Sequence, residues 1–308
     1  MFDTLNSQQQ AAVEHSGSPL LVVAGAGTGK TKTLAARVVR ILADGADPER
    51  VLLLTFTRRA AAEMIGRVAA VSPDRSATQV WGGTFHSIAN RLLRIHGRSA
   101  GLDSGFTVLD QSDSTDLMGM VRTEEGFGER SRRFPRKETV AGVYSRMVSS
   151  QAKLADVLET DYPWCADHAD ALRTIFTAYT SRKRANNVLD YDDMLLFWRG
   201  LTASPVGETL RALFDHVLID EYQDTNPVQA DIVRGMCGAG TEVCAVGDDA
   251  QAIYGFRSAT VANMWDFPEH FPGATRVTLE QNYRSTTPIL AVANAVLSQS
   301  NDHFGKQL

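Results

Sequence analysis

Short apolar segments that alternate with helical stretches constrain the fold of this chain more than any other feature. Five such segments stand out: Leu20–Ala24, Val51–Thr55, His216–Asp220, Glu242–Gly247 and Thr275–Gln281. Each is of strand length, and the stretches between them carry apolar residues at helical spacing. Continuous apolar strands separated by helices are typical of a parallel sheet with helices on both faces. We therefore predict an α/β fold.

The middle of the chain follows a different pattern. From about Ile88 to Ser204 the sequence is richer in charge and helical spacing, and apolar strand segments are scarce. We expect residues 1–87 and 209–284 to form one α/β domain, which residues 88–208 interrupt as a mostly helical insert.

Composition excludes several classes of protein. Among 308 residues, 44% are apolar and 22% charged, which is ordinary for a globular protein and disfavours wholesale disorder. The formal net charge of −5 excludes a uniformly basic nucleic-acid coat protein. It does not exclude a local basic groove, because phosphate contacts depend on local patches.

The cysteines and the apolar runs predict a cytoplasmic protein. Cys165, Cys237 and Cys244 are far apart and form no CxxC pair, so a disulfide framework and a zinc ribbon are both disfavoured. The first ten residues, MFDTLNSQQQ, lack the pattern of a signal peptide. The longest apolar runs, such as Leu20–Ala24, are far too short to span a bilayer.

The segment AGAGTGKT, Ala24–Thr31, follows a predicted strand and opens a predicted helix, as the Walker A phosphate-binding motif requires. Its glycines let backbone N–H groups approach a phosphate, and the helix N-terminus adds partial positive charge. Lys30 would reach the β- and γ-phosphates, and Thr31 would bind Mg²⁺. The strict pattern has Gly in the place of Ala24, which permissive forms tolerate. An ordinary Gly-rich turn is the alternative, and GKT in this context argues against it.

An acidic pair directly follows the apolar segment that begins at His216. Asp220 and Glu221 would lie at the carboxyl edge of the sheet, which faces the ligand crevice in open α/β folds. Asp220 can hold Mg²⁺ through its water shell, and Glu221 can orient and deprotonate an attacking water. A solvated acidic loop is the alternative. The Walker A segment in the same chain favours the catalytic interpretation of the pair.

Two further loops after predicted strands carry polar and aromatic residues. The first, VGDDAQAIYGFR, presents Gln251 and Arg257, and the second, LEQNYRS, presents Tyr283 and Arg284. Arg284 could neutralise γ-phosphate charge in the manner of an arginine finger, and Tyr283 could stack on a base. Each loop taken alone is more simply a surface turn. Their order and combination carry the argument.

Together these segments resemble the UvrD/PcrA/Rep-type superfamily 1 DNA helicases, collinearly over Leu5–Ser285. The segments described above resemble motifs I, II, III and IV of that family. In addition, LNSQQQAAV at Leu5–Val13 resembles its Q motif, and TFTRRAAAEM at Thr55–Met64 resembles motif Ia. WGGTFHS at Trp81–Ser87 resembles motif Ib, and LDYDDML at Leu189–Leu195 resembles the acidic segment that closes the insert.

The resemblance implies a RecA-like P-loop NTPase fold and the activity of a DNA-dependent ATPase and 3′–5′ DNA helicase, in DNA repair or replication. ATP and Mg²⁺ would be its cofactors, and single-stranded DNA and single-strand/duplex junctions its partners. The residues implied in catalysis are Lys30, Glu221, Gln251 and Arg284, and those implied in holding the metal are Thr31 and Asp220. Those implied in nucleotide binding are Gln9, Ala24, Gly25, Ala26, Gly27, Thr28, Gly29, Lys30, Thr31, Lys32, Tyr283 and Arg284.

The resemblance also implies a path for single-stranded DNA, because aromatic side chains offer sequence-tolerant stacking platforms and Arg takes the phosphates. The residues implied are Phe56, Arg58, Arg59, Thr84, Phe85, His86, Tyr254, Phe256 and Arg257. Core packing is the alternative for the aromatics, and for Phe85 above all. The family usually has Asn and Lys in the places of Arg58 and Arg59, and Trp in the place of Phe256. Two guanidiniums change the geometry of phosphate contacts, and Phe offers less ring area.

The family has a second motor domain after motif IV, and residues 285–308 look like its start. Ser285–Ser298 predicts a helix with Ile289, Val292 and Val296 on one face. One lobe would bind nucleotide and weakly bind single strands, and we do not expect it to unwind a duplex alone.

Two other functions stay open from the sequence. One is a non-enzymatic module that binds nucleotide or a partner, and the other is an unrelated P-loop ATPase or kinase. The second gives no reason for TFHS, for NYRS or for the aromatics near Arg257. A basic cluster in the insert is expected to be a solvated loop, with duplex contact as the alternative. Its members are Arg130, Arg132, Arg133, Arg136 and Lys137.

Overall fold

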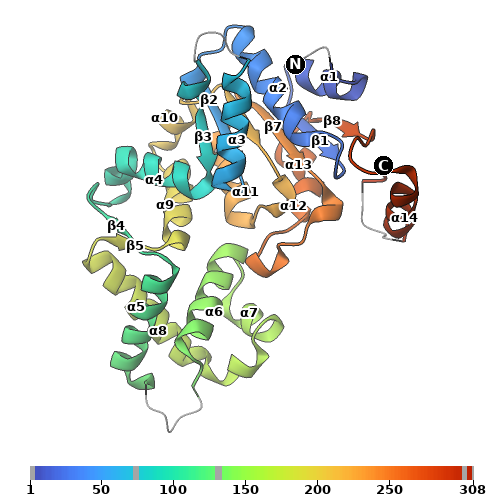
Figure 1. The fold of residues 1–308 in the computed structure, drawn as a ribbon. Coiled ribbons are helices and arrows are strands. Elements are labelled where there is room, and N and C mark those ends of the chain that lie inside the picture. The colour runs from blue at the N-terminus through green and yellow to red at the C-terminus, as the bar shows by residue number, and fades with distance from the viewer. Residues whose placement is uncertain (1–3, 72–75, 129–133, 300–303, 307–308) are drawn as a thin grey trace. The chain divides into compact units, whose positions relative to one another are not determined.

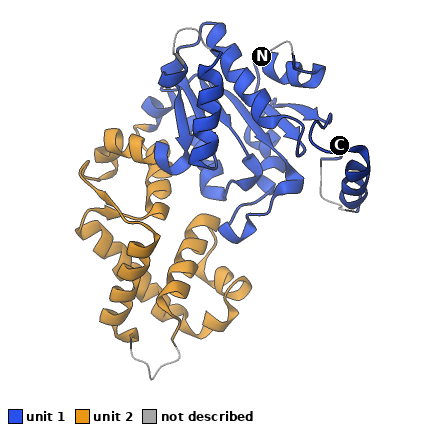
Figure 2. Cartoon of the chain, in the orientation of Figure 1, with its two compact units in different colours: residues 1–88, 207–308 blue, residues 89–206 orange. Residues whose placement is uncertain are grey.

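The computed structural model describes residues 4–71, 76–128, 134–299 and 304–306. The chain divides into two compact units, shown in Figure 2: residues 1–88 with 207–308 form unit 1, and residues 89–206 form unit 2. The boundaries expected from the sequence were 87/88 and 208/209. Residues 285–308, expected to begin a further domain, are grouped with unit 1.

Unit 1 is built on a six-stranded sheet with the strand order β3-β2-β6-β7-β1-β8 (Figure 1). Every neighbouring pair runs parallel. The strands are β1 (Leu20–Ala24), β2 (Val51–Thr55), β3 (Trp81–Thr84), β6 (His216–Ile219), β7 (Glu242–Gly247) and β8 (Thr275–Leu279). The predicted α/β fold with a parallel sheet is confirmed.

The edge strand β3 was not among the predicted strands, because two of its four residues are glycines and little of it is apolar. Side chains from α3 and α4 approach the backbone of β3 closely at both glycines. A Cβ atom at Gly82 would lie 2.8 Å from the side chain of Ile65, and one at Gly83 would lie 2.3 Å from Ser87 Oγ. The need for space beside the backbone therefore explains glycine at these positions, although glycine has a low propensity for strands.

Helices of unit 1 follow the strands in the expected alternation. Helix α11 begins with a reciprocal cap: the Gln229 N–H donates to Asn226 Oδ1, the Asn226 N–H donates to Gln229 Oε1, and Pro227 is the first helical residue. These helices are α1 (Ser7–Glu14), α2 (Lys30–Ala43), α3 (Arg58–Ala69), α10 (Gly207–Arg211), α11 (Pro227–Met236), α12 (Ala262–Trp265), α13 (Phe267–His270) and α14 (Thr287–Leu297). Helix α4 (Phe85–His96) begins in unit 1 and continues in unit 2.

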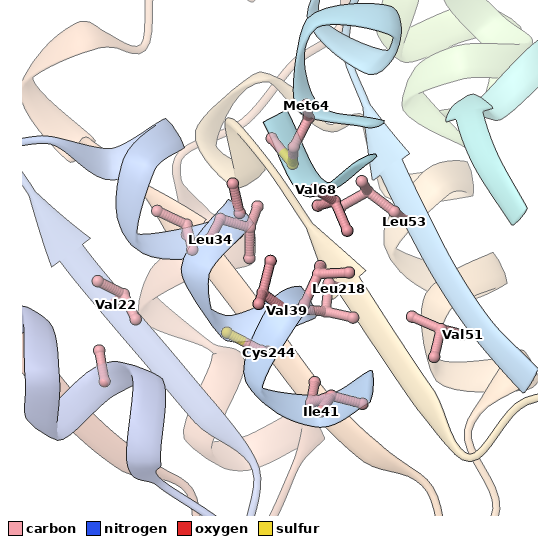
Figure 3. Packing of buried hydrophobic residues seen from close by; sticks show 14 of the residues in the cluster. Val22, Leu34, Val39, Ile41, Val51, Leu53, Met64, Val68, Leu218 and Cys244 are labelled. Carbon is pink, nitrogen blue, oxygen red and sulfur yellow. The ribbon is translucent and has the colours of Figure 1, made fainter. Parts of the chain in front are cut away.

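The main core of unit 1 lies between the sheet and helices α2 and α3 (Figure 3). Val22, Leu53 and Leu218 from three strands meet Leu34 of α2 and Met64 of α3, and each is at most 1% exposed. The intervening residues of β1 and β2 are buried as well. Both faces of the sheet are therefore covered, as continuous apolar strands predict.

Parallel pairing brings the carboxyl ends of all six strands to one edge of the sheet. The loops that follow β1, β6, β7 and β8 carry the Walker A segment, the acidic pair, and the two polar loops named above. The fold thus collects segments that lie far apart in the sequence, over a span from Gly25 to Ser285.

Unit 2 is mostly helical, with one short parallel strand pair. Its elements include β4 (Thr107–Val108), α5 (Gln111–Arg122), α6 (Lys137–Ser150), α7 (Leu154–Thr160), α8 (Ala169–Ala185), β5 (Val188–Leu189) and α9 (Tyr191–Ala203). Arg130, Arg132 and Arg133 of the basic cluster lie outside the described residues, and Lys137 is ion-paired with Asp116 at 2.5 Å. No described helix combines the length and the apolar character that crossing a membrane needs.

A buried ionic cluster lies in unit 2. Lys183 Nζ lies 2.5 Å from Asp190 Oδ2 and 2.6 Å from Asp193 Oδ2, and Tyr179 Oη donates to Asp190 at 2.8 Å. Desolvation and, second to it, the Asp190 carboxylate raise the pKa of the neighbouring Asp192 to about 7. Burial of charge therefore acts against the ionised form of Asp192.

This pKa predicts a pH dependence of stability. An unfolded Asp titrates near pH ~4, so between about pH 4 and about pH 7 the folded chain holds a proton on Asp192 that the unfolded chain releases. Raising the pH across this range favours unfolding, by up to ~1.4 kcal/mol per pH unit. Urea unfolding at several pH values measures the free energy of unfolding, and Asp192→Asn should lessen its decline with rising pH. The exposed Asp156 of α7 provides the control, and an equal effect of Asp156→Asn would contradict the assignment.

Candidate functional site

The loop between β1 and α2 has the conformation of a phosphate-binding turn. Gly27 and Gly29 have φ angles of +79° and +89°, which glycine adopts without strain. Thr28 Oγ1 donates to Gly25 O at 2.8 Å and closes the turn. Gly29 occupies the N-cap of α2 without a side-chain capping bond, so the first N–H groups of the helix stay available for an anion.

The lysine of this loop lies near carboxylates from the loops that follow β6 and β7. Lys30 Nζ lies 3.8 Å from Glu221 Oε2 and 3.7 Å from Asp248 Oδ2, and it donates to Ala24 O at 3.3 Å. Its side chain is 10% exposed. The ammonium group is therefore held at the sheet edge, and a triphosphate would have to draw it away from these two partners.

The acidic pair follows β6 directly. Asp220 is buried, and its Oδ1 has no hydrogen-bond partner among the described residues. Burial and, to a smaller extent, the Glu221 carboxylate raise the pKa of Asp220 to about 7 against the opposing effect of Lys30. A bare, desolvated carboxylate oxygen next to a phosphate-binding turn fits a divalent cation, which would favour the charged form.

Glu221 is held in an unusual backbone conformation. Its φ and ψ are both +50°, in the left-handed region that non-glycine residues seldom adopt. Gln223 Nε2 donates to Glu221 Oε2 at 2.8 Å and fixes the carboxylate. Such backbone strain concentrates at functional sites, where surrounding contacts maintain it.

The loop after β7 is bonded to the acidic loop. The Asp248 N–H donates to Gln223 Oε1 at 2.9 Å, so Gln223 bridges the loops that follow β6 and β7. Gln251 Nε2 donates to Asp248 Oδ2, which is also the oxygen nearest Lys30. Gln251 is thereby connected to Lys30 through one carboxylate.

The loop after β8 packs against the phosphate-binding turn. Asn282 Nδ2 donates to Ala26 O at 2.5 Å, and the Tyr283 N–H donates to Gly27 O at 2.9 Å. Asn282 Oδ1 accepts the N–H groups of Arg284 and Ser285 at 2.8 and 2.9 Å, which shapes the loop. The side chains of Tyr283 and Arg284 are exposed beside this contact.

Helix α1 joins the same assembly. Gln9 Nε2 donates to Thr28 O at 2.9 Å, and Gln9 Oε1 accepts the Asn6 N–H at 3.1 Å. Asn6 Nδ2 donates to Tyr283 Oη at 2.9 Å, and Lys32 Nζ donates to Thr4 O at 2.7 Å. The amide of Gln9 is satisfied within the protein, so contact with an adenine stays a prediction.

A cavity of about 470 Å³ connects the acidic pair to aromatic residues. It is lined on one side by Thr31, Asp220 and Glu221, and on the other by Phe56 and Tyr254. Its remaining lining residues are Thr57, Ala60, Glu63, Gln223, Asp224, Ala250, Gln251 and Ile253. Groups suited to phosphate and metal chemistry therefore share one hollow with two aromatic rings.

An aromatic row begins at this cavity. The ring centroids of Phe56 and Tyr254 are 4.8 Å apart, and those of Tyr254 and Phe256 are 5.7 Å apart. The guanidinium carbon of Arg257 lies 5.7 Å from the ring centroid of Phe256, which is 74% exposed. An exposed aromatic beside a cation is the arrangement that stacks bases and holds phosphates.

The remaining predicted DNA residues lie around α3 and β3. Arg58 and Thr84 line a common hollow of about 320 Å³, and Arg59 is exposed at the start of α3. Phe85 is 5% exposed, so its ring is packed inside the protein. His86 is partly exposed beside it.

Comparison with known proteins identifies the family. A model of the UvrD/REP helicase N-terminal domain matches residues 5–272. The ATP-dependent DNA helicase UvrD1 of Mycobacterium leprae is 39% identical over all of this chain and 41% of its own length. The ATP-dependent DNA helicases PcrA of Leuconostoc citreum and Staphylococcus aureus are 36% and 34% identical, over 99% and 100% of this chain.

The chain belongs to the UvrD/REP helicase family. It spans about two-fifths of the length of these relatives. The resemblance drawn from the sequence motifs is thereby confirmed, and so is the RecA-like P-loop fold.

Sequence reasoning missed three polar residues of this UvrD/REP-family site. Gln223 bridges two loops, Asn282 fastens a third loop to the phosphate-binding turn, and Asn6 contacts Tyr283. Asn6 and Asn282 stand inside the segments LNSQQQAAV and LEQNYRS, and Gln223 lies two residues after Glu221. Their partners lie on other strands, however, so no local spacing could have assigned these bonds.

The packing of the turn predicts the effect of a single methyl group. In Gly27→Ala, the new Cβ would lie 2.6 Å from Arg284 Cβ and 3.0 Å from the Asn282 amide, so the loop after β8 must move. We expect faster amide hydrogen exchange at Tyr283, measured by mass spectrometry of peptides from that loop. Gly17→Ala is the matched control, because Gly17 has φ +82° and open space around it. Both variants should lose ~1 kcal/mol of stability from backbone strain. Equal exchange at Tyr283 in both variants would contradict the packing.

Proposed function

We propose that this chain binds Mg²⁺·ATP at the carboxyl edge of its sheet, hydrolyses it, and couples hydrolysis to movement along single-stranded DNA. It would be the first motor lobe of a 3′–5′ DNA helicase. The observation that carries the proposal is the convergence of Lys30, Glu221 and Gln251 beside the unpartnered oxygen of Asp220. The relatives that match the whole chain are themselves named ATP-dependent DNA helicases.

The residues at this edge divide the work of phosphoanhydride hydrolysis. Lys30 would leave its carboxylate partners and bind the β- and γ-phosphates. Thr31 and Asp220 would hold Mg²⁺, which neutralises phosphate charge when bound. Glu221, fixed by Gln223, would orient a water and accept its proton. Gln251 and Arg284 lie on loops that adjoin the turn and would contact the γ-phosphate.

The adenine would lie near Tyr283, Gln9 and Lys32. Tyr283 is 58% exposed, and its hydroxyl accepts a bond from Asn6 of the segment that also carries Gln9. An exposed, oriented ring next to a phosphate-binding turn supports stacking on a base.

Single-stranded DNA would follow the aromatic row that begins at the cavity. Phe56, Tyr254 and Phe256 offer rings in series, and Arg257, with Arg58 and Arg59, would take phosphates. Since Gln251 and Tyr254 belong to one loop and line one cavity, that loop would transmit the state of the γ-phosphate to the grip on DNA. Thr84 and His86 would extend the path, and Phe85 would support it from inside.

Unwinding would need more than the lobe described here. The relatives are more than twice as long as this chain, and the apolar residues Ile289, Val292 and Val296 of α14 are exposed. We infer that a second motor domain packs near α14 in the complete motor and that the substrate is a single-strand/duplex junction. A chromosomal substrate of this kind would place the protein in the cytoplasm, in DNA repair or replication.

Substitution of the two catalytic candidates should separate binding from hydrolysis. Lys30→Ala removes the phosphate-binding cation and should weaken Mg²⁺·ATP binding at least ~10-fold, whereas Glu221→Gln should keep binding and lower hydrolysis by ~100-fold or more. Calorimetric titration measures binding, and phosphate release with and without single-stranded DNA measures hydrolysis. Arg40→Ala, at the far end of α2, should change neither quantity. If Lys30→Ala leaves affinity and turnover intact, the proposed site is wrong.

Truncation of the most exposed aromatic should weaken binding of a single strand. Phe256→Ala removes one stacking platform and should cost ~1–3 kcal/mol in the affinity for an oligothymidine, measured by fluorescence anisotropy. Trp164→Ala is the control, because Trp164 is 68% exposed but lies in unit 2. An equal loss in both variants would indicate nonspecific apolar contact and refute the proposed path.

A further inference from the structure

A second lysine is buried beside the nucleotide site, and none of the roles assigned above uses it. The side chain of Lys306 is 1% exposed and is ion-paired with both Asp248 and Asp249, the two acids that follow β7. The Phe304 N–H donates to Asp249 Oδ2 at 2.9 Å. The segment 304–306 is therefore fastened to the loop that carries Gln251.

Lys306 and Lys30 share one carboxylate. Lys306 and the Ala250 N–H bond to Asp248 Oδ1, whereas Lys30 and Gln251 approach Oδ2. The Asp248 side chain is 3% exposed, so water compensates little of its charge. Its two oxygens are thus divided between two cations.

The charges around Asp248 decide what happens when Lys30 leaves. Lys30 and Lys306 face the buried Asp248 and Asp249. The third carboxylate near Lys30, that of Glu221, is more exposed to solvent, at 34%. Without Lys306, movement of Lys30 to a phosphate would leave Asp248 as a buried anion with no cation, which is strongly unfavourable. With Lys306 in place, Asp248 keeps a cation throughout.

We propose that Lys306 is a positioning residue for the nucleotide site, which frees Lys30 to bind the triphosphate by compensating Asp248. The inference rests on the proposed function, because it concerns how Lys30 reaches ATP. It assigns to Lys306 no contact with the nucleotide.

Calorimetric titration of the 308-residue chain with Mg²⁺·ATP tests this role. Lys306→Met should raise the Kd about 10-fold, as expected when one charge-assisted contact to a phosphate is weakened. Lys306→Arg keeps the charge and should restore the Kd to within about twofold of the unsubstituted chain. Asp248→Asn removes the carboxylate that Lys30 and Lys306 share, so in this background Lys306→Met should change the Kd less than about twofold.

Lys183→Met is the matched control for burial. Lys183 is likewise a buried lysine bonded to two aspartates, but it lies in unit 2. Lys183→Met should lower the melting temperature without changing the Kd for Mg²⁺·ATP. Should Lys306→Met fail to fold, the variant with Asp249→Asn added removes one cation and one anion together, and it should show the same rise in Kd.

Three results would overturn the inference. The first is a Kd within about twofold of the value for the unsubstituted chain, either for Lys306→Met or for the double variant Lys306→Met with Asp249→Asn. The second is an equal loss of affinity in the Asp248→Asn background, which would make Lys306 merely structural. The third is an unsubstituted chain that does not bind Mg²⁺·ATP, and this result alone removes the proposed function as well.

Discussion

The ion pairs of Lys30 with Glu221 and Asp248 depend on the register of three parallel strands. In that register β1 pairs with β7 through Val23 and Gly247, and β7 pairs with β6 through Ala245 and Ile219. The three strands consequently end side by side, and the loops that follow them bring Lys30, Glu221 and Asp248 together at one point of the sheet edge. A shift in strand register would separate the lysine from both carboxylates, so the site depends on the core that fixes the register.

The buried ion pairs of the two units differ in geometry. In unit 2, Lys183 lies within 2.6 Å of two aspartates, and Tyr179 donates to one of them. At the sheet edge, Lys30 lies at 3.7–3.8 Å from its partners, and an oxygen of Asp220 has no partner among the described residues. Short, satisfied contacts stabilise a structure, whereas long and incomplete ones leave groups ready to bind a ligand. The geometry distinguishes two clusters that look equally acidic in the sequence.

Much of this could be predicted from the sequence, because strand and turn signals are local. The five apolar segments and the phosphate-binding turn each depend on neighbouring residues. The edge strand β3 was missed because its glycines are set by space near Ile65 rather than by strand propensity. The roles of Asn282 and Lys306 were missed because their partners are 256 and 57–58 residues away. Core packing was the alternative for the aromatic residues, and for Phe85 above all; the structure shows Phe85 buried at 5% exposure and Phe256 exposed at 74%.

The bond from Asn282 to Ala26 connects the turn after β1 to the segment that precedes α14. Asn282 bonds at one end to the carbonyl of that loop and at the other to the Ser285 amide, two residues before α14 begins. A ligand that tightens the loop around its phosphates would pull on Asn282 and so tilt the start of α14. Because a helix is stiff, a tilt at its first turn would displace its far end more than its start. The apolar stripe of α14 would therefore register, at a distance, whether the turn is filled.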